Sequence, residues 1–185
     1  MANSIQAKGA GANGAQGKGA AKRTRRRGQA SEAKRLQQAE MLLNISQKVA
    51  GIESLDEVLE TLIELTTWEL GAERGSLFLN DPQSGELYSR VALLNLRREI
   101  RLLNTSGVAG HVFTNDEGVI IHDAYKDKRF NRSIDEQTGY ITKNICCAPV
   151  RTVKGEVIGV AQVLNKKEGR FTLEDLQLLE AMTTQ

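Results

Sequence analysis

The spacing of apolar residues changes at Gly71, and this change constrains the fold more than any other feature of the chain. Before Gly71, apolar residues recur as on one face of a helix, at Val58, Leu59, Leu62 and Ile63. This spacing predicts a helix over residues 55–70, which Ser54 and Glu57 begin as a capping box and Gly71 ends. After Gly71 the apolar runs become short or alternating, which is typical of strands. The chain therefore combines helices with a sheet.

The order of the remaining elements predicts an α+β fold. The expected strands lie at residues 76–80, 86–93, 99–103, 118–121, 144–150 and 157–164. A short helix is expected from Gly107, and a capped amphipathic helix from Thr172 that continues beyond Gln185. The polar stretch 123–143 is expected to form a lid with a short helix at 134–140. We expect an antiparallel sheet of about six strands, with flanking helices on one face and a ligand pocket under the lid on the other.

The first part of the chain differs in composition from the rest. Residues 1–30 contain almost no large apolar side chain and are expected to be disordered. They hold seven of the 25 Lys and Arg residues and no acid, which leaves 18 bases and 23 acids in residues 31–185. A solvated tail is favoured over a nucleic-acid- or lipid-binding arm, because no aromatic residue interleaves the charges. Leu36, Leu43 and Ala50 repeat at every seventh position, which predicts an amphipathic helix over 31–52 whose apolar face needs a partner.

Several functional classes are disfavoured by the sequence. No apolar run approaches the roughly 18 to 20 residues of a membrane-spanning helix, so no membrane association and a cytoplasmic location are expected. Cys146 and Cys147 are adjacent, and neither His111 nor His122 has a second ligand at metal-binding spacing, so no metal site is expected. No Gly-rich phosphate loop is present. We assign no catalytic residue and expect this chain to regulate another activity rather than to be an enzyme.

A signature near the end of the chain resembles that of a known family. Asn165, Lys166, Phe171 and Asp175 match the Asn-Lys, Phe, Asp-Glu signature of GAF domains, although the final Glu is Leu176 here. The sequence is similar to the cyclic-nucleotide-binding GAF domains of phosphodiesterases and of cyanobacterial-type adenylate cyclases. The resemblance covers residues 40–185, with the domain itself at 53–185. A Lys and an Asp on either side of one loop can also pair, which would clamp the last strand to the last helix.

The resemblance implies a site for a small anionic ligand. The implied ligand contacts are Ser76, Arg90, Ala92, Val108, Ala109, Asn131, Asp135, Thr138, Thr142 and Gln162. Val108 and Ala109 would start a helix whose free backbone amides face a cyclic phosphate, because helix N-termini attract anions. In the lid, Asn131 would add a backbone contact to phosphate, and Asp135 would approach the base. Thr138 and Thr142 would offer hydroxyl groups near the ribose and phosphate.

The wall opposite the lid would come from the strands. Arg90 and Ala92 are two residues apart on one strand, so both are expected to point into the pocket with Ser76. Gln162 interrupts an apolar run, and a buried amide there needs a partner such as the edge of a base. Because Gln can exchange its donor and acceptor, it does not decide between adenine and guanine.

The implied function is that of a regulatory module without a cofactor. It would bind a cyclic nucleotide, with cyclic AMP favoured over cyclic GMP. The flanking helices would form a homodimer and transmit the signal to an output domain. The alternative is a dimerisation or protein-interaction module that binds no ligand or a different small metabolite.

Overall fold

A computed structural model of the chain describes residues 54–92 and 99–183, together with six residues between 32 and 43. The chain divides into two units, Met1–Leu43 and Asn44–Gln185. In the first unit the six described residues all have helical backbone. The remainder of the predicted helix at 31–52 and the whole predicted tail at 1–30 lie outside the described residues.

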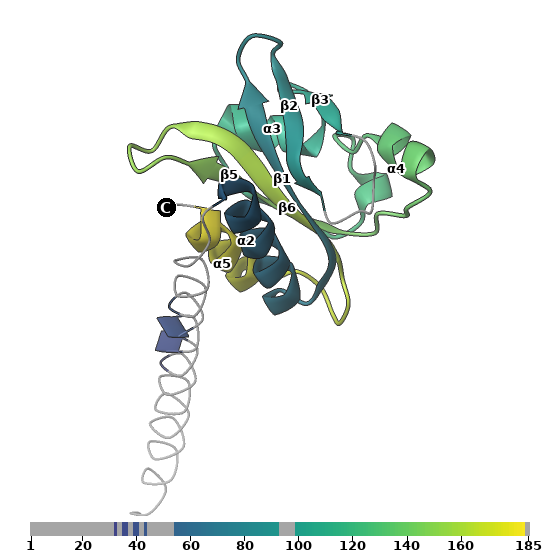
Figure 1. The fold of residues 1–185 in the computed structure, drawn as a ribbon. Coiled ribbons are helices and arrows are strands. Elements are labelled where there is room, and N and C mark those ends of the chain that lie inside the picture. Colours follow the sequence, from purple (N-terminus) through teal and green to yellow (C-terminus); the bar gives the residue numbers. More distant parts are fainter. Residues whose placement is uncertain are drawn as a thin grey trace, which may run out of the picture. The chain divides into compact units, whose positions relative to one another are not determined.

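The second unit contains a six-stranded antiparallel sheet with helices packed on both faces (Figure 1). In spatial order the strands are β3 (Arg101–Leu103), β2 (Glu86–Ala92), β1 (Ala72–Asp81), β6 (Val157–Lys166), β5 (Ile145–Arg151) and β4 (Val119–Ile121). On one face lie α2 (Leu55–Glu69) and α5 (Leu173–Thr183). On the other lie α3 (Gly107–Asn115), the short 3-10 helix η1 (Ala124–Lys126) and α4 (Arg132–Thr138). The predicted α+β class and the antiparallel sheet are confirmed.

Most element boundaries agree with the sequence patterns, and the differences have local causes. Gly71 ends α2 with a left-handed φ of +56°, as predicted, but the Ser54 side chain makes no capping hydrogen bond, so the predicted capping box is wrong. Strand β1 begins at Ala72 instead of residue 76, because its first half pairs with β6. Helix α4 spans 132–138 instead of 134–140, because the Asn131 side chain caps its start and Gly139, with φ +68°, ends it.

Side chains alternate along the two central strands and so form two apolar layers. Leu77 and Val163 point toward α2 and α5, whereas Phe78 and Leu164 point toward α3. In the first layer α2 packs directly on β1. The packing is so close that a Cβ at Gly75 would lie only 2.0 Å from the Thr67 hydroxyl, so only glycine fits there. The first layer is the main core, and the second layer borders the cavity described below.

The Lys and Asp of the signature tie the last strand to the last helix. The Lys166 ammonium lies 3.0 Å from Asp175 Oδ1, and the two side chains are only 17% and 18% exposed. Asp175 Oδ2 also accepts a hydrogen bond of 2.8 Å from the backbone N–H of Thr172, ahead of α5. Leu176, where the family signature has Glu, is buried in the layer under α5. The predicted clamp therefore forms without the missing carboxylate.

Asn165 connects the end of β6 to the last residues of the lid. It is 2% exposed and adopts a left-handed φ of +57°. Its Oδ1 accepts a hydrogen bond from Lys143 N at 2.6 Å, and its Nδ2 donates to Ile141 O at 2.9 Å and to Glu73 Oε2 at 3.1 Å. The hydrogen bond from Asn165 lowers the pKa of the Glu73 carboxyl, with a second contribution from Tyr140. The end of the lid is thus fixed beside Lys166.

The clamp predicts a large effect of one substitution. Asp175→Ala leaves a mostly buried lysine without its partner and removes a capping acceptor, so the free energy of unfolding should fall by about 2–4 kcal/mol in urea titrations. Gln177→Ala, at an exposed position of the same helix, is the matched control and should change stability by less than about 0.5 kcal/mol. A loss below about 1 kcal/mol for Asp175→Ala would show that the pair behaves as a surface ion pair.

Candidate functional site

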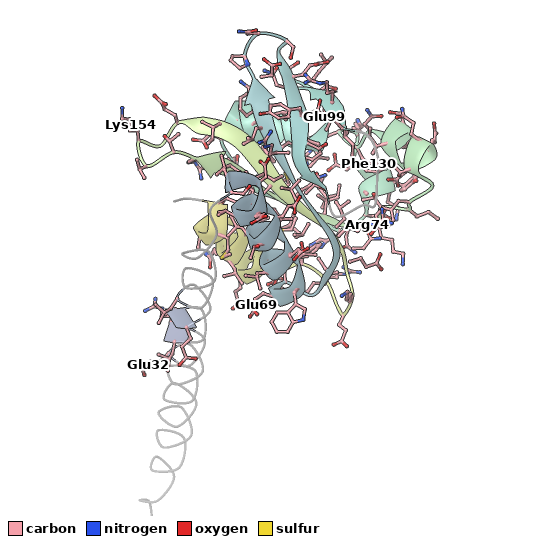
Figure 2. The ribbon with its side chains drawn as sticks, in the orientation of Figure 1. Glu32, Glu69, Arg74, Glu99, Phe130 and Lys154 are labelled. Carbon is pink, nitrogen blue, oxygen red and sulfur yellow. The ribbon has the colours of Figure 1, made fainter. Side chains whose placement is uncertain are left out.

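A cavity of about 770 Å³ lies on the face of the sheet opposite α2 and α5. Its walls are the middle of β1 and β6, residues 99–103, the first turn of α3, and residues 130–142. Glu99 and Phe130, from two of these walls, are labelled in Figure 2. Most of the predicted ligand contacts line it: Ser76, Val108, Ala109, Asn131, Asp135, Thr138, Thr142 and Gln162. A cavity of this size suits a small organic molecule.

The first turn of α3 lines the cavity and carries unpaired backbone amides. Ser106 is the N-cap residue, and its side chain makes no capping hydrogen bond. The amides of Gly107, Val108 and Ala109 have no hydrogen-bond acceptor among the described residues, and the first bond into the helix is that of Gly110 to Ser106 O. Gly107 has φ +74°, a conformation that glycine adopts without strain. Free amides and the helix dipole make this turn favourable for an anion.

Two polar side chains of the sheet lie side by side in the cavity wall. Ser76 of β1 is paired in register with Gln162 of β6, and both line the cavity. The Ser76 hydroxyl is fully buried and has no hydrogen-bond partner, and among the described residues it is the one buried side-chain polar atom in this condition. Such a group is costly to bury unless something bonds to it. A ligand could supply that bond only if the side chains that cover Ser76 moved, because the hydroxyl is not accessible from the cavity in this conformation.

Among the predicted contacts whose side chains the structure describes, Arg90 is the one that does not line the cavity. Leu77 is paired with Val91 and Phe78 with Ser89, so Arg90 is an extra residue in a β-bulge of β2. The bulge breaks the alternation on which the prediction for Arg90 relied. Arg90 instead forms an ion pair with Asp56 of α2, on the other face of the sheet. The backbone of Ala92 pairs with that of Ser76, and its side chain is not described.

The polar side chains at the two ends of α4 are used to build the lid. Asn131 Oδ1 accepts hydrogen bonds from the backbone N–H and the hydroxyl of Ser133, at 3.0 and 2.8 Å. The Thr138 hydroxyl donates to Ile134 O at 2.8 Å and accepts a weaker bond of 3.3 Å from Tyr140 N. These residues line the cavity as predicted, and their side chains also fix the short helix.

Asp135 has its carboxylate at the centre of the lid. It is 6% exposed, and its Oδ1 accepts a hydrogen bond of 2.7 Å from the Thr142 hydroxyl. Its Oδ2 accepts one of 2.7 Å from Thr142 N and one of 3.0 Å from the Tyr125 hydroxyl. The bond to Asp135 raises the pKa of the Tyr125 hydroxyl. The predicted ligand contacts Asp135 and Thr142 are therefore bonded to each other.

Tyr140 is a wall residue that the sequence analysis did not select. Its hydroxyl donates to Glu73 Oε2 at 2.9 Å, and the guanidinium carbon of Arg74 lies 3.8 Å from its ring centroid. Burial and the hydrogen bond to Glu73 raise the pKa of the Tyr140 hydroxyl. Arg74 thus contacts one face of the ring and Glu73 binds its hydroxyl group. Both partners lie far from Tyr140 in the sequence. In the sequence, the one feature that could have indicated Tyr140 as a wall residue is that it is an aromatic residue in a polar stretch.

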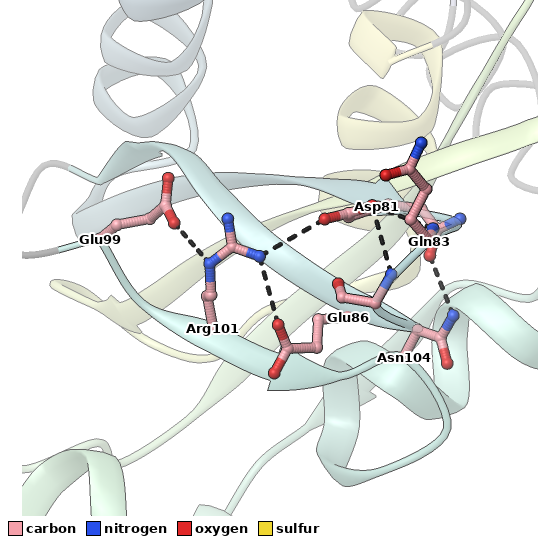
Figure 3. Close-up of polar contacts among 8 residues, drawn as sticks. Asp81, Gln83, Glu86, Glu99, Arg101 and Asn104 are labelled. Carbon is pink, nitrogen blue, oxygen red and sulfur yellow. Dashed lines mark hydrogen bonds and ion pairs between the residues drawn. The ribbon is translucent and has the colours of Figure 1, made fainter.

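Arg101 of β3 contributes the one cationic side chain among the described lining residues. It is engaged with three carboxylates, Glu99 at 2.7 Å, Glu86 at 3.2 Å and Asp81 at 3.5 Å (Figure 3). The carboxylates raise the pKa of the Arg101 guanidinium, that of Glu86 most of all. The cluster ties β3 to the β1–β2 hairpin, so the positive charge near the cavity is already neutralised.

Comparison with known proteins identifies the family. The GAF domain model matches residues 54–185, which is most of the chain. The chain belongs to the GAF domain family. The signature residues Asn165, Lys166, Phe171 and Asp175 lie within the matched range.

Related GAF domains occur in much longer proteins. The probable 3′,5′-cyclic phosphodiesterase pde-5 of Caenorhabditis elegans is 34% identical over 161 residues, which cover 80% of this chain and 22% of that protein. The dual 3′,5′-cyclic-AMP and -GMP phosphodiesterase 11 of Drosophila melanogaster is 35% identical over 155 residues, 75% of this chain and 11% of that protein. The chain thus spans less than a quarter of either relative.

Solved structures agree on the fold of the GAF domain. The GAF domain of a phosphoenolpyruvate-protein phosphotransferase from Coxiella burnetii has a TM-score of 0.70 at 19% identity, covering 79% of this chain and 88% of that chain. The free methionine-R-sulfoxide reductase of Neisseria meningitidis has a TM-score of 0.67 at 18% identity, covering 79% and 83%. At these identities the likeness establishes the fold alone.

Three further features of the described residues bear on other possible functions: metal binding, membrane crossing and thiol chemistry. It contains no group of three or more His, Cys, Asp or Glu side chains placed to hold a metal ion. No helix within the described ranges has the length and apolar character needed to cross a membrane. Cys146 and Cys147 are buried free thiols, and burial raises the pKa of Cys146 to about 12, so this thiol is protonated at neutral pH.

The unpaired Ser76 hydroxyl predicts an unusual response to substitution. In the ligand-free domain, Ser76→Ala removes a buried group without a partner, so the free energy of unfolding should stay constant or rise by up to about 1 kcal/mol. Thr142→Val, at a buried hydroxyl that donates to Asp135, is the matched comparison and should lose about 1–3 kcal/mol. Equal losses for the two variants in urea titrations would show that Ser76 has a partner within the protein.

Proposed function

We propose that this GAF domain is a regulatory module that binds a cyclic nucleotide in the cavity and transmits the signal to an output domain. The observation that carries the proposal is the meeting of two unsatisfied groups in one cavity: the free amides at 107–109 and the buried Ser76 hydroxyl. Cyclic AMP is favoured over cyclic GMP, on the resemblance to regulators of adenylate cyclases. The names of the phosphodiesterase relatives support the same ligand class.

The anion end of the cavity suits a cyclic phosphate. A cyclic phosphodiester carries a single negative charge, and backbone amides with a helix dipole can stabilise one such charge without a cationic side chain. Arg101, the cation among the described lining residues, is already paired with carboxylates. A doubly charged 5′-phosphate would leave its second charge without a partner there, which is costly in a partly buried site.

The wall formed by the sheet suits the edge of a base. Ser76 can donate and accept one hydrogen bond each, and the neighbouring Gln162 amide can do both as well. The aromatic residues Phe78 of β1 and Tyr140 of the lid also line the cavity. A purine can therefore bond along its polar edge and stack on its faces.

The rival function, an interaction module without a ligand, has its own supporting observation. On the helical face Trp68 and Leu55 of α2 and Leu173 of α5 are 74%, 67% and 64% exposed. If these side chains contributed to one apolar surface, that surface would favour contact with a partner. The proposed function also includes a homodimer through the flanking helices. The regulatory module and the interaction module therefore differ in whether a cyclic nucleotide binds in the cavity.

Isothermal titration calorimetry with cyclic AMP, cyclic GMP and 5′-AMP tests the proposal. We expect saturable binding of the cyclic nucleotides and much weaker binding of 5′-AMP. A ligand concentration of about a thousand times Kd should raise the free energy of unfolding by about 4 kcal/mol. No heat and no change in melting temperature with either cyclic nucleotide would favour the interaction module.

Two variants locate the binding site. Ser76→Ala should raise Kd by about 5- to 20-fold, since it removes one hydrogen bond to the ligand while leaving the fold intact. Arg90→Ala is the matched control, because its ion pair with Asp56 lies on the other face, and its Kd should stay within about twofold of the wild-type value. A larger rise in Kd for Arg90→Ala than for Ser76→Ala would place the nucleotide outside this cavity.

A further inference from the structure

Three segments of the lid converge on one buried carboxylate. Asp135 belongs to α4, Tyr125 to η1, and Thr142 to the segment before β5. The three hydrogen bonds that Asp135 accepts join these segments at 2.7 to 3.0 Å. We call Tyr125, Asp135 and Thr142 the lid anchor.

The lid anchor satisfies a charge that would otherwise be costly. A carboxylate that is 6% exposed needs hydrogen bonds or a cation, and the described ion pairs include none to Asp135. Three neutral donors fill three of its roughly four acceptor positions. Opening the lid by moving α4 away from η1 and from Thr142 exchanges these bonds for water, so the anchor opposes that movement. Little of the carboxylate's bonding capacity remains for a ligand.

Tyr125 makes the anchor testable because it is separate from the cavity wall. It is absent from the lining residues, although Asp135 and Thr142 are present. Its ring lies 5.3 Å from that of Phe130, and the Arg132 guanidinium carbon lies 5.1 Å from its centroid. Arg132 also donates to Tyr125 O at 2.8 Å. Removing only the hydroxyl therefore leaves the ring and its neighbours in place.

We propose that Asp135 is a positioning residue that holds the lid closed through Tyr125 and Thr142, and thereby sets the lifetime of the bound ligand without selecting its base. The ligand part of this inference rests on the proposed function. The lid part does not, because the three hydrogen bonds of the anchor join residues of this chain alone.

The first test measures hydrogen exchange of the ligand-free domain. Tyr125→Phe should speed the exchange of backbone amides at 132–143 by about 5- to 20-fold, as expected for the loss of one hydrogen bond to a charged group. Amides of β1 and β6 should keep their rates. Tyr88→Phe is the matched control, since no hydrogen bond of its hydroxyl is described, and it should leave the lid unchanged. Unchanged exchange of the lid in Tyr125→Phe overturns the proposal, whether or not a nucleotide binds.

The second test measures dissociation rates of fluorescent cyclic AMP and cyclic GMP analogues by stopped flow. Tyr125→Phe should speed the release of both by the same factor, about 5- to 20-fold, with the ratio of the two affinities unchanged within twofold. Asp135→Asn should act in the same direction and more strongly. A changed affinity ratio in Asp135→Asn, with normal release from Tyr125→Phe, would make Asp135 a base-contacting residue and overturn the proposal. Failure of both nucleotides to bind wild type overturns the proposed function and the ligand part, while the exchange result still decides the lid part.

Discussion

The alternation of side chains along β1 and β6 underlies both the core and the cavity. Leu77 and Val163 bury one face of these strands under α2 and α5, and this layer holds the sheet together. Because that layer supplies the core, the opposite face can carry polar residues such as Ser76 and Gln162. A single central pair of strands thus separates the part of the domain that stabilises the fold from the part that borders the cavity.

The sequence predicts features that depend on neighbours along the chain. Helical and alternating periods separate α2 from the strands, and Gly71 marks the boundary. The pair between Lys166 and Asp175 is predictable because the two residues flank one loop. The start of α3 is predictable because glycine and small residues follow a capping position.

Features that depend on pairing between distant segments are not predictable in this way. The bulge at Arg90 becomes visible only when β2 is aligned with β1, and it reverses the direction expected for that side chain. The hydrogen bonds of Asp135 require Tyr125 and Thr142 to meet, and no local pattern indicates that meeting. Ser76 was selected from the resemblance, but the absence of a partner for its hydroxyl is a property of the folded sheet.

The same contacts offer a physical route from the cavity to the last helix. The last residues of the lid are bonded to Asn165. The next residue along the chain, Lys166, is paired with Asp175 of α5. Closure of the lid over a ligand would act on this connection. In the proposed function a ligand changes the output only to the extent that it binds the closed form more tightly than the open form.

The most direct measurement is the amide NMR spectrum of the isotopically labelled domain during titration with cyclic AMP. Main-chain amides at the start of α3 should bond to the phosphate, so the protons of Gly107, Val108 and Ala109 should move downfield together and saturate at the concentration that saturates the heat of binding. Saturating nucleotide that leaves these three signals in place, or that shifts only residues of α2 and α5, would contradict the central claim that backbone amides in this cavity neutralise the ligand.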